Sequence, residues 1–301
     1  MEDTCTIVQI PGKGRGLVAT RAIARGELIF AEAPLFVQRN NVSPQTIADA
    51  LAKLPRDDQM RFLSLANSWK GVQHPLVGLW LTNAIPCGTP DDPHGDKTEV
   101  EGIFPAIARL NASCCPNLYH WWDAATQRLY FRAARDIAIG EELCMTYMDA
   151  LVPRAKRLAL IKQHYNYECR CPACKLTDQE GHDSDYRRST IARIRSQLLE
   201  YNDPSYGLHK VRMALRLLDE EGLLEVYGNP FYANGFEFCA LAGDAESASA
   251  WAGKAWEFEC VTKGPDSESA QEWEQRAEHP QRSPLFGTGP RKYTLQGPDV
   301  W

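Results

Sequence analysis

The chain has 301 residues, of which 44% are hydrophobic and 24% are charged. These fractions are close to globular averages, so we expect one to three packed domains and exclude wholesale disorder. The net charge is −6, and the acidic excess lies in residues 181–301, which hold 19 acidic and 13 basic side chains. This excess could attract a basic protein substrate or simply solvate helix faces. No basic stripe is present, which disfavours nucleic-acid binding.

The apolar segments and the cysteines indicate the compartment. No apolar run approaches the length of a membrane span, and the acidic first four residues do not begin a signal peptide. We therefore expect a cytoplasmic or nuclear protein with no membrane attachment. Its 10 cysteines should be reduced or metal-bound rather than paired in disulfides. We also expect a monomer.

The first hundred residues predict strands and then helices. Residues 6–10 are β-prone and stop at a Pro-Gly pair, and shorter strands are expected at 17–19 and 27–30. Residues 44–69 change to the apolar spacing of helices. A stretch at 88–96 that is rich in proline, glycine and acidic residues predicts a loop.

The pattern returns to strands and then becomes helical. Strands are expected at 118–122, 128–131 and 142–147, before apolar residues at helical spacing from residue 153 onward. Small residues between the helices predict a degenerate tetratricopeptide-like array, since no fixed repeat is visible. Asp244 is expected to cap a helix, and 287–301 forms a tail punctuated by glycine and proline.

Three cysteines within six residues give the strongest chemical signal. Cys169, Cys171 and Cys174 have the close spacing of zinc ligands, and the alternative is a set of free cysteines. A structural zinc site requires four ligands. The other dense thiol site is Cys114 and Cys115, about fifty residues upstream, so a fourth ligand is expected there.

Four motifs occur in one order: GKGRG at 12–16, RLNASCCPN at 109–117, GEELCMTY at 140–147 and CRCPAC at 169–174. Together they resemble the SET-domain protein lysine methyltransferases. Residues 147–169 resemble the SMYD branch of that family, and residues 82–85 with 102–105 resemble fungal SET proteins of the same type. The MYND zinc finger of that branch is absent, because residues 40–100 contain one cysteine and two histidines.

The resemblance implies an α+β protein with a β-rich SET fold and a threaded pseudoknot. Residues 1–40 and 102–149 would form the two parts of the SET domain. Residues 41–101 would be a helical insertion with a loop, and residues 150–176 a zinc-binding post-SET segment. Residues 177–301 would form a C-terminal helical, tetratricopeptide-like domain that packs over the substrate cleft.

The resemblance also implies the cofactors, S-adenosylmethionine and zinc, and the residues that hold them. Zinc would be bound by Cys114, Cys169, Cys171 and Cys174. The implied cofactor-binding residues are Lys13, Gly14, Arg15, Asn83, Asn111, Ala112, Tyr147 and Tyr167. Lys13 and Arg15 would flank the carboxylate and ribose, Asn83 and Asn111 would bind the amino-acid end and adenine, and Tyr167 would stack on adenine.

Two tyrosines carry the implied catalysis. Tyr147 would be the catalytic tyrosine, whose hydroxyl orients the reacting groups, and Tyr165 would line the lysine channel. Each implied role has a structural alternative: a hairpin turn for the glycines, a helix C-cap for Asn83, and buried aromatic packing for the tyrosines. Asn117 is expected to be structural. The implied substrate is a lysine side chain of a protein, which must be neutral to accept a methyl group.

Ala112 departs from the family pattern, which has a histidine at this position. The loss of an imidazole could leave a cavity, or leave the Tyr147 hydroxyl without its partner. Three functions are therefore compatible with the sequence. They are a protein lysine methyltransferase, a SET fold used for a small-molecule reaction, and a non-catalytic cofactor-binding or interaction protein.

Overall fold

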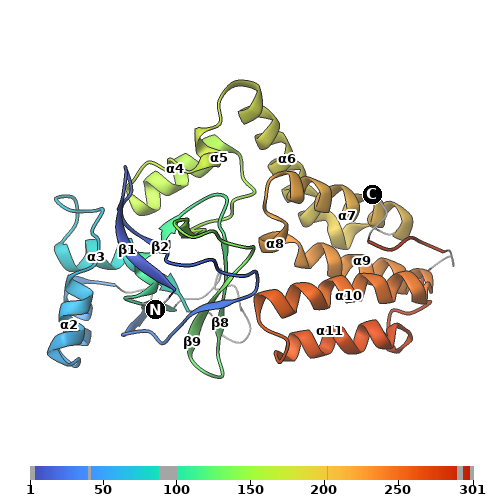
Figure 1. Ribbon diagram of the computed structural model, residues 1–301, viewed down its shortest axis with the longest axis horizontal. Coiled ribbons are helices and arrows are strands. Elements are labelled where there is room, and N and C mark those ends of the chain that lie inside the picture. The colour runs from blue at the N-terminus through green and yellow to red at the C-terminus, as the bar shows by residue number, and fades with distance from the viewer. Residues whose placement is uncertain (1–3, 40–41, 88–99, 202, 290–293, 299–301) are drawn as a thin grey trace. The chain divides into compact units, whose positions relative to one another are not determined.

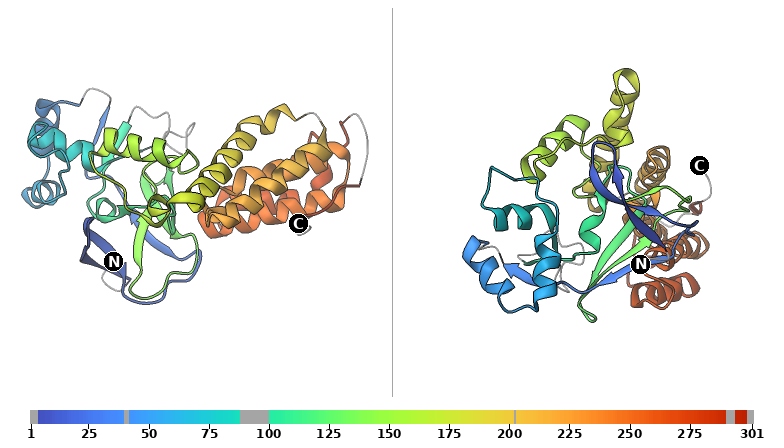
Figure 2. Two further views of the ribbon diagram at one scale, coloured as in Figure 1. Left: turned by 90° about the horizontal axis from the view of Figure 1, so that it is seen from above. Right: turned by 60° about the vertical axis from the view of Figure 1, so that its left-hand side comes forward.

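The computed structural model describes residues 4–39, 42–87, 100–201, 203–289 and 294–298. The loop expected at 88–96 lies outside the described residues. The chain divides into two compact units. Unit 1 comprises Met1–Met148 with Ala155–Cys174 and is rich in strands, whereas unit 2 comprises Asp149–Arg154 with Lys175–Trp301 and is helical (Figures 1 and 2). In the part of the chain that is described, no helix is long and apolar enough to span a lipid bilayer.

Unit 1 is built on three small sheets, with strand orders β1-β2-β10-β7, β3-β9-β8 and β4-β6-β5. The strands are β1 (Cys5–Ile10), β2 (Gly14–Ala19), β3 (Leu28–Glu32), β4 (Val37–Arg39), β5 (Ala84–Pro86), β6 (Val100–Ile103), β7 (Asn111–Ala112), β8 (Leu118–Asp123), β9 (Arg128–Ala133) and β10 (Glu142–Met145). The mixture of these sheets with helices confirms the α+β class. The third sheet was not expected, because strands of three or four residues leave no periodic signal.

The first sheet brings segments that are distant in sequence to one edge. β10 pairs with β2 in antiparallel fashion and with β7 in parallel fashion, so that Cys144 faces Asn111 and Met145 faces Ala112. The Ser113 amide then donates to the Met145 carbonyl at 2.8 Å. The turn between β1 and β2 and the second sequence motif are thereby set on the two sides of β10.

Short helices complete unit 1: α1 (Pro44–Leu51), α2 (Arg56–Leu63), α3 (Pro75–Asn83), η1 (Ile107–Arg109), α4 (Arg154–Tyr165) and α5 (Pro172–Lys175). The helical stretch expected at 44–69 is two helices, because Pro55 begins a new helix at its N-cap. Ile47, Phe62 and Trp80 are fully buried in a core shared by α1, α2 and α3. The strand expected at 142–147 ends earlier, at Met145.

Unit 2 is helical, as expected. Its helices are α6 (Asp178–Gln197), η2 (Leu198–Glu200), α7 (Pro204–Glu220), α8 (Leu224–Tyr227), α9 (Asn229–Ala242), α10 (Ala245–Thr262), α11 (Glu268–Glu278) and η3 (Pro280–Arg282). Asp244 caps α10 by accepting from the Ser247 amide. Gly235 lets α9 approach α10 closely, because a Cβ there would lie 2.4 Å from the Trp251 ring. The tetratricopeptide-like character of this array stays a prediction.

Residues 294–298 lie along unit 2 and are held through their main chain. Asp244 accepts from the Leu295 amide at 2.6 Å, and the Ser247 hydroxyl donates to the Leu295 carbonyl at 2.8 Å. Trp251 donates to the Gln296 carbonyl at 3.1 Å through its indole nitrogen. Part of the tail expected at 287–301 is therefore an ordered element of unit 2.

Candidate functional site

A cavity of about 550 Å³ opens in unit 1. It is lined by the β1–β2 turn, the end of α3, the η1–β7 segment, Tyr147 and the segment after α4. All the residues to which the resemblance gave a cofactor or catalytic role line it, namely Lys13, Gly14, Arg15, Asn83, Asn111, Ala112, Tyr147, Tyr165 and Tyr167. The folding of five distant segments thus gathers these side chains around one space, while their roles stay predictions.

The glycine turn requires glycine for two separate reasons. Gly12 and Gly14 have positive φ angles of 74° and 78°, which favour a residue without a Cβ. Gly16 has no room for a side chain, because a Cβ there would lie 2.5 Å from the Asn111 amide nitrogen and 3.2 Å from a Glu142 carboxylate oxygen. Glycine at these positions therefore allows the backbone of the turn to lie directly against the cavity wall.

Glu142 joins the two sides of this wall. Its Oε2 accepts from the Lys13 ammonium at 2.6 Å, and its Oε1 accepts from the Asn111 side-chain amide at 2.9 Å. Burial alone would lower the pKa of Lys13, but the hydrogen bond to Glu142, together with the negative charges around it, raises that pKa overall. Glu142 lies within one of the four sequence motifs, but no role was predicted for it, because its two partners lie 129 and 31 residues away.

Asn83 is the last residue of α3 and is almost fully buried. Its side-chain nitrogen donates to the carbonyls of Ala66 and Leu79, both at 2.7 Å. The side-chain oxygen is therefore the atom that Asn83 offers to a ligand in the cavity, and an oxygen there can accept from an ammonium group.

Two tyrosines form a hydrogen-bonded pair in the cavity wall. The Tyr147 hydroxyl donates to the Leu110 carbonyl at 2.7 Å, and the Tyr165 hydroxyl donates to the Tyr147 carbonyl at 3.0 Å. Their ring centroids lie 5.0 Å apart. Burial raises the pKa of Tyr147 well above its ordinary value and raises that of Tyr165 to about 12. Both hydroxyls are therefore protonated at neutral pH.

The hydrogen bond of Tyr147 corrects one expectation about Ala112. One outcome expected from the loss of the family's histidine was a Tyr147 hydroxyl without its partner, but the Leu110 carbonyl supplies a partner. Ala112 itself lies in β7 opposite Met145, where its backbone belongs to the sheet. With alanine at position 112, the Tyr147 hydroxyl is therefore oriented by the main chain of Leu110.

Tyr167 presents an unusual polar atom in the cavity. Its ring lies at 89° to that of Tyr147, with centroids 6.5 Å apart. Its hydroxyl is buried, and among the described residues it has no hydrogen-bond partner. A buried polar group without a partner is costly, so this hydroxyl fits a ligand that supplies a polar atom.

Arg15 and Arg109 converge on one residue at the edge of the cavity. Arg15 donates to the Ser64 carbonyl at 3.1 Å, and Arg109 donates to the same carbonyl at 3.4 Å and to the Ser64 hydroxyl at 3.1 Å. Burial, together with the positive charge of Arg15, lowers the pKa of Arg109. Arg109 opens the second sequence motif, but no role was predicted for it, because its partner Ser64 lies 45 residues away.

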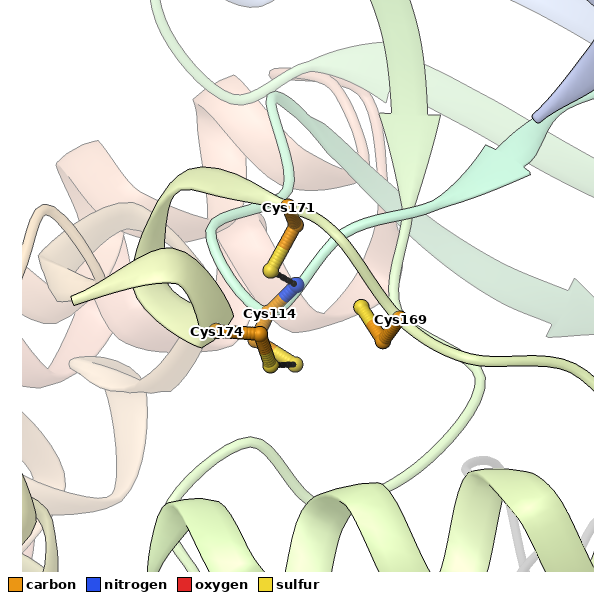
Figure 3. A group of neighbouring side chains, drawn as sticks. All are labelled: Cys114, Cys169, Cys171 and Cys174. Carbon is orange, nitrogen blue, oxygen red and sulfur yellow. Dashed lines mark hydrogen bonds between the residues drawn. The ribbon is translucent and has the colours of Figure 1, made fainter. Parts of the chain in front are cut away.

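Four buried thiols meet beside the cavity (Figure 3). The sulfur atoms of Cys114, Cys169, Cys171 and Cys174 all lie within 4.8 Å of one another. A tetrahedral zinc–thiolate site with bonds of about 2.3 Å places its sulfurs about 3.8 Å apart, and the Cys114–Cys174 sulfurs are separated by 3.6 Å. The donor set therefore fits zinc. Cys115, the other candidate, is not in the group.

Asn117 is occupied entirely within the sheet region. Its side-chain nitrogen donates to the Glu142 carbonyl at 2.9 Å, and its side-chain oxygen accepts from the Cys144 amide at 2.8 Å. Its exposed fraction is only 2%. These bonds hold the second motif against β10, which supports the structural role expected for Asn117.

Comparison with known proteins gives consistent matches. Residues 14–148 match the SET domain. Histone-lysine N-methyltransferase set5 of Schizosaccharomyces pombe is 29% identical over 283 residues, which cover 93% of this chain and 85% of that protein. Human histone-lysine N-methyltransferase SMYD3 is 37% identical over 80 residues, or 27% of this chain and 18% of that protein. The N-lysine methyltransferase SMYD2 of Sus scrofa is 26% identical over 148 residues, or 48% and 30%.

These matches define the class of domain in the chain. Residues 14–148 match a SET domain, and the relatives that share it are named as histone-lysine or N-lysine methyltransferases. The match to the yeast protein extends over most of both chains, whereas this chain spans less than a third of the two SMYD proteins. The solved SET domain of LSMT bound to lysine and AdoHcy overlaps with a TM-score of 0.35 at 11% identity, covering 95% of this chain and 90% of that one. An overlap this loose adds no weight to the assignment.

Proposed function

We propose that this chain transfers the methyl group of S-adenosylmethionine to the side-chain amine of a protein lysine. The observation that carries the proposal is the convergence of residues from four sequence motifs around one cavity beside a four-thiol group. A hairpin turn or a helix cap alone would not require the other segments to meet there. The proposal also includes one structural zinc ion held by Cys114, Cys169, Cys171 and Cys174.

The polar groups of the cavity suit the amino-acid end and the base of this cofactor. The free oxygen of Asn83 suits an ammonium group, and the unpartnered hydroxyl of Tyr167 suits a polar atom near its ring. The cofactor supplies an electrophilic methyl group carried on a positively charged sulfur. The residues of the chain contribute binding, orientation and the exclusion of water.

Tyr147 and Tyr165 would form the channel through which the lysine enters. Because both hydroxyls stay protonated, they would orient a neutral amine by hydrogen bonding and would not remove its proton. An apolar channel beside a positive sulfur lowers the pKa of the incoming lysine through desolvation and like charge. The channel would thereby favour the neutral amine that the transfer requires.

A protein lysine is the substrate favoured by the relatives. The yeast protein and SMYD3 are both named as histone-lysine methyltransferases, so the core histones are the first substrates to test. The acidic residues 181–301 are compatible with a basic protein of this kind. No observation favours a small-molecule reaction over this substrate class.

The test combines binding with transfer. Calorimetry with S-adenosylhomocysteine should show one site per chain, and methyl-labelled S-adenosylmethionine should label core histones at lysine, as mapped by mass spectrometry. A protein that binds no cofactor analogue would overturn the proposal. A protein that binds the analogue and labels neither histones nor a lysate of the source cells would point to the non-catalytic alternative.

A further inference from the structure

The charges that line the cavity are paired unevenly. Five basic side chains line it, namely Lys13, Arg15, Arg109, Lys162 and Arg170. Lys13 is paired with the carboxylate of Glu142, and Arg170 lies 3.5 Å from that of Glu168. Among the residues that the structure describes, no carboxylate pairs with Arg15 or Arg109. Both donate to Ser64, whose carbonyl and hydroxyl are neutral.

We propose that Arg15 and Arg109 form an anion subsite that binds the carboxylate of the cofactor's amino-acid end, and that Glu142 withholds Lys13 from this task. The inference rests on the proposed function. It changes the assignment implied by the family pattern, in which Lys13 shares the carboxylate with Arg15. It also adds Arg109, to which that pattern gives no role.

The geometry at Ser64 supports this subsite. A guanidinium carries five N–H donors, of which Arg15 uses one and Arg109 two on Ser64. The shared carbonyl holds two like charges close together, which an anion placed between them would relieve. Planar guanidinium groups also match a planar carboxylate through paired hydrogen bonds.

The geometry at Glu142 explains why Lys13 is not available. Its ammonium lies 2.6 Å from a carboxylate oxygen, in a pair whose side chains are only 21% and 19% exposed. The same carboxylate accepts from the Asn111 side chain, and Gly16 lies directly against both Asn111 and Glu142. Transfer of the ammonium to a ligand would leave the Glu142 carboxylate with one donor in a half-buried setting. The ammonium of Lys13 therefore stabilises the glycine turn through Glu142 and is not available to a ligand.

The remaining cation, Lys162, is a weaker candidate. Lys162 lies on α4 and is exposed, as Arg15 is, but in the described part of the chain no hydrogen bond orients its ammonium, whereas Ser64 holds the guanidinium groups of Arg15 and Arg109. Arg109 is half-buried and anchored by two hydrogen bonds, so its donors are already oriented. Preorganised donors bind a charge at lower entropic cost.

The contribution of the carboxylate to binding can be measured with a pair of ligands. S-adenosylhomocysteine and its carboxamide differ at this group alone, so the ratio of their dissociation constants measures its recognition. Wild-type protein should bind the acid about tenfold more tightly than the amide. Arg109→Gln and Arg15→Gln should each reduce this ratio to about two, and Arg109→Lys should restore part of it. Thermal melting without ligand checks that each variant is folded.

Three further variants complete the test. Lys13→Gln and Lys162→Gln should change the affinity for both ligands by the same factor and leave their ratio intact. Arg216→Gln, an exposed residue of unit 2, is the matched control for loss of an arginine charge. A ratio that depends on Lys13 and not on Arg109 would overturn the subsite alone. Wild-type protein that binds neither ligand would overturn the proposed function and the subsite with it.

Discussion

The two units of the chain are held together in different ways. Unit 1 joins segments that are far apart in sequence through a few polar groups: Lys13 to Glu142 across 129 residues, and Cys114 to Cys174 across 60. In unit 2, α9, α10 and α11 pack mainly on their neighbours in the chain, around a core that includes Phe231 and Trp251. Unit 1 also has apolar cores of its own, so the difference lies in the long-range polar connections around its cavity.

This contrast predicts that the units respond differently to single changes. A polar connection in unit 1 should be critical for the cavity, while exposed positions on the helices of unit 2 should tolerate substitution. The two exceptions in unit 2 are a buried ion cluster and the docked segment 294–298. The experiments below test the contrast and these exceptions, from the largest expected effect to the smallest.

Loss of the thiol group should have the largest effect. Cys171→Ser removes a buried sulfur from the proposed zinc site, and structural zinc sites contribute about 10 kcal/mol or more to folding in small domains. We expect zinc below half an equivalent by elemental analysis and loss of the unit 1 melting transition, with the helical signal of unit 2 retained by circular dichroism.

Cys115→Ser is the matched control, because Cys115 lies next to Cys114 outside the thiol group. It should keep one zinc per chain and both transitions. Equal loss of zinc in the two variants would show that the ligand set is wrong. Simultaneous melting of both units in the Cys171 variant would break the contrast between them.

The buried ion cluster of unit 2 should come next. Glu221 accepts from Ser184 at 2.8 Å, from Arg187 at 2.6 Å and from Arg188 at 2.7 Å, and the side chain of Arg188 is fully buried. Glu221→Ala leaves a buried guanidinium without its carboxylate, so the free energy of unfolding of unit 2 should fall by about 3–5 kcal/mol. Urea titration followed by circular dichroism measures this change.

The neighbouring Glu220 supplies the control. Its carboxylate is half exposed and lies 3.9 Å from both Arg187 and Arg216. Exposed ion pairs of this kind contribute about 0–1 kcal/mol, so Glu220→Ala should leave the urea midpoint nearly unchanged. Similar losses in the two variants would mean that burial does not decide the contribution of these charges.

Tyr147→Phe tests the site without disturbing the scaffold. The hydroxyl is oriented by Leu110 and should act mainly in the transition state, so we expect methyl transfer to slow by about 100-fold or more. The affinity for S-adenosylhomocysteine should stay within about threefold. Single-turnover transfer of labelled methyl groups and calorimetry measure the two quantities.

Tyr130→Phe is a suitable comparison for this variant, because the Tyr130 hydroxyl donates to the exposed Thr126 hydroxyl on the β8–β9 hairpin and, among the described residues, to no other group. Its transfer rate should equal that of the wild type. If Tyr147→Phe kept near-full turnover, the assigned catalytic role would be wrong.

The docked segment of unit 2 should respond more weakly. Ser247→Ala removes the hydroxyl that donates to the Leu295 carbonyl, a loss of about 1 kcal/mol for one hydrogen bond. Limited proteolysis should then release the end of the chain faster than in the wild type. Ser196→Ala should leave the cleavage rate unchanged, because the Ser196 hydroxyl donates to the Arg193 carbonyl of its own helix.

The smallest effect on folding is expected at position 112. Ala112→His places an imidazole in the cavity wall, where Ala112 is half-exposed and its backbone lies in β7. The melting temperature should shift by no more than the equivalent of about 1 kcal/mol, while the transfer rate changes by a larger factor. An unchanged rate and unchanged cofactor affinity would show that this departure from the family pattern is neutral.

The sequence was sufficient to predict which residues form the site, but not which hydrogen bonds and ion pairs connect them. The glycine turn, the thiols and the tyrosines stand in local motifs, so spacing and residue type point to them. Glu142 and Arg109 act through partners 31 to 129 residues away, and no local pattern encodes such pairings. The order of segment 294–298 was not predicted either, because the segment is held through its main-chain atoms, which leave no residue pattern in the sequence.

The prediction of secondary structure also depended on whether the signal is local in the sequence. The helical end of the chain was predictable, because apolar spacing is a property of each helix alone. The third sheet, β4-β6-β5, depends on pairing between strands of only three or four residues. The stabilisation of such strands comes from their neighbours in space, so the sequence gives little sign of them.

Cys169 lines the cavity and is also one of the four clustered thiols. Cys169 therefore lies next to the ligand cavity and also belongs to a group of thiols that oxidants can modify. A disulfide formed by peroxide would bring two of these sulfurs to about 2.05 Å, from 3.6 Å for Cys114 and Cys174. Tyr167 lies two residues before Cys169, so we expect preparations that differ only in reducing agent to differ in how well they accept a ligand.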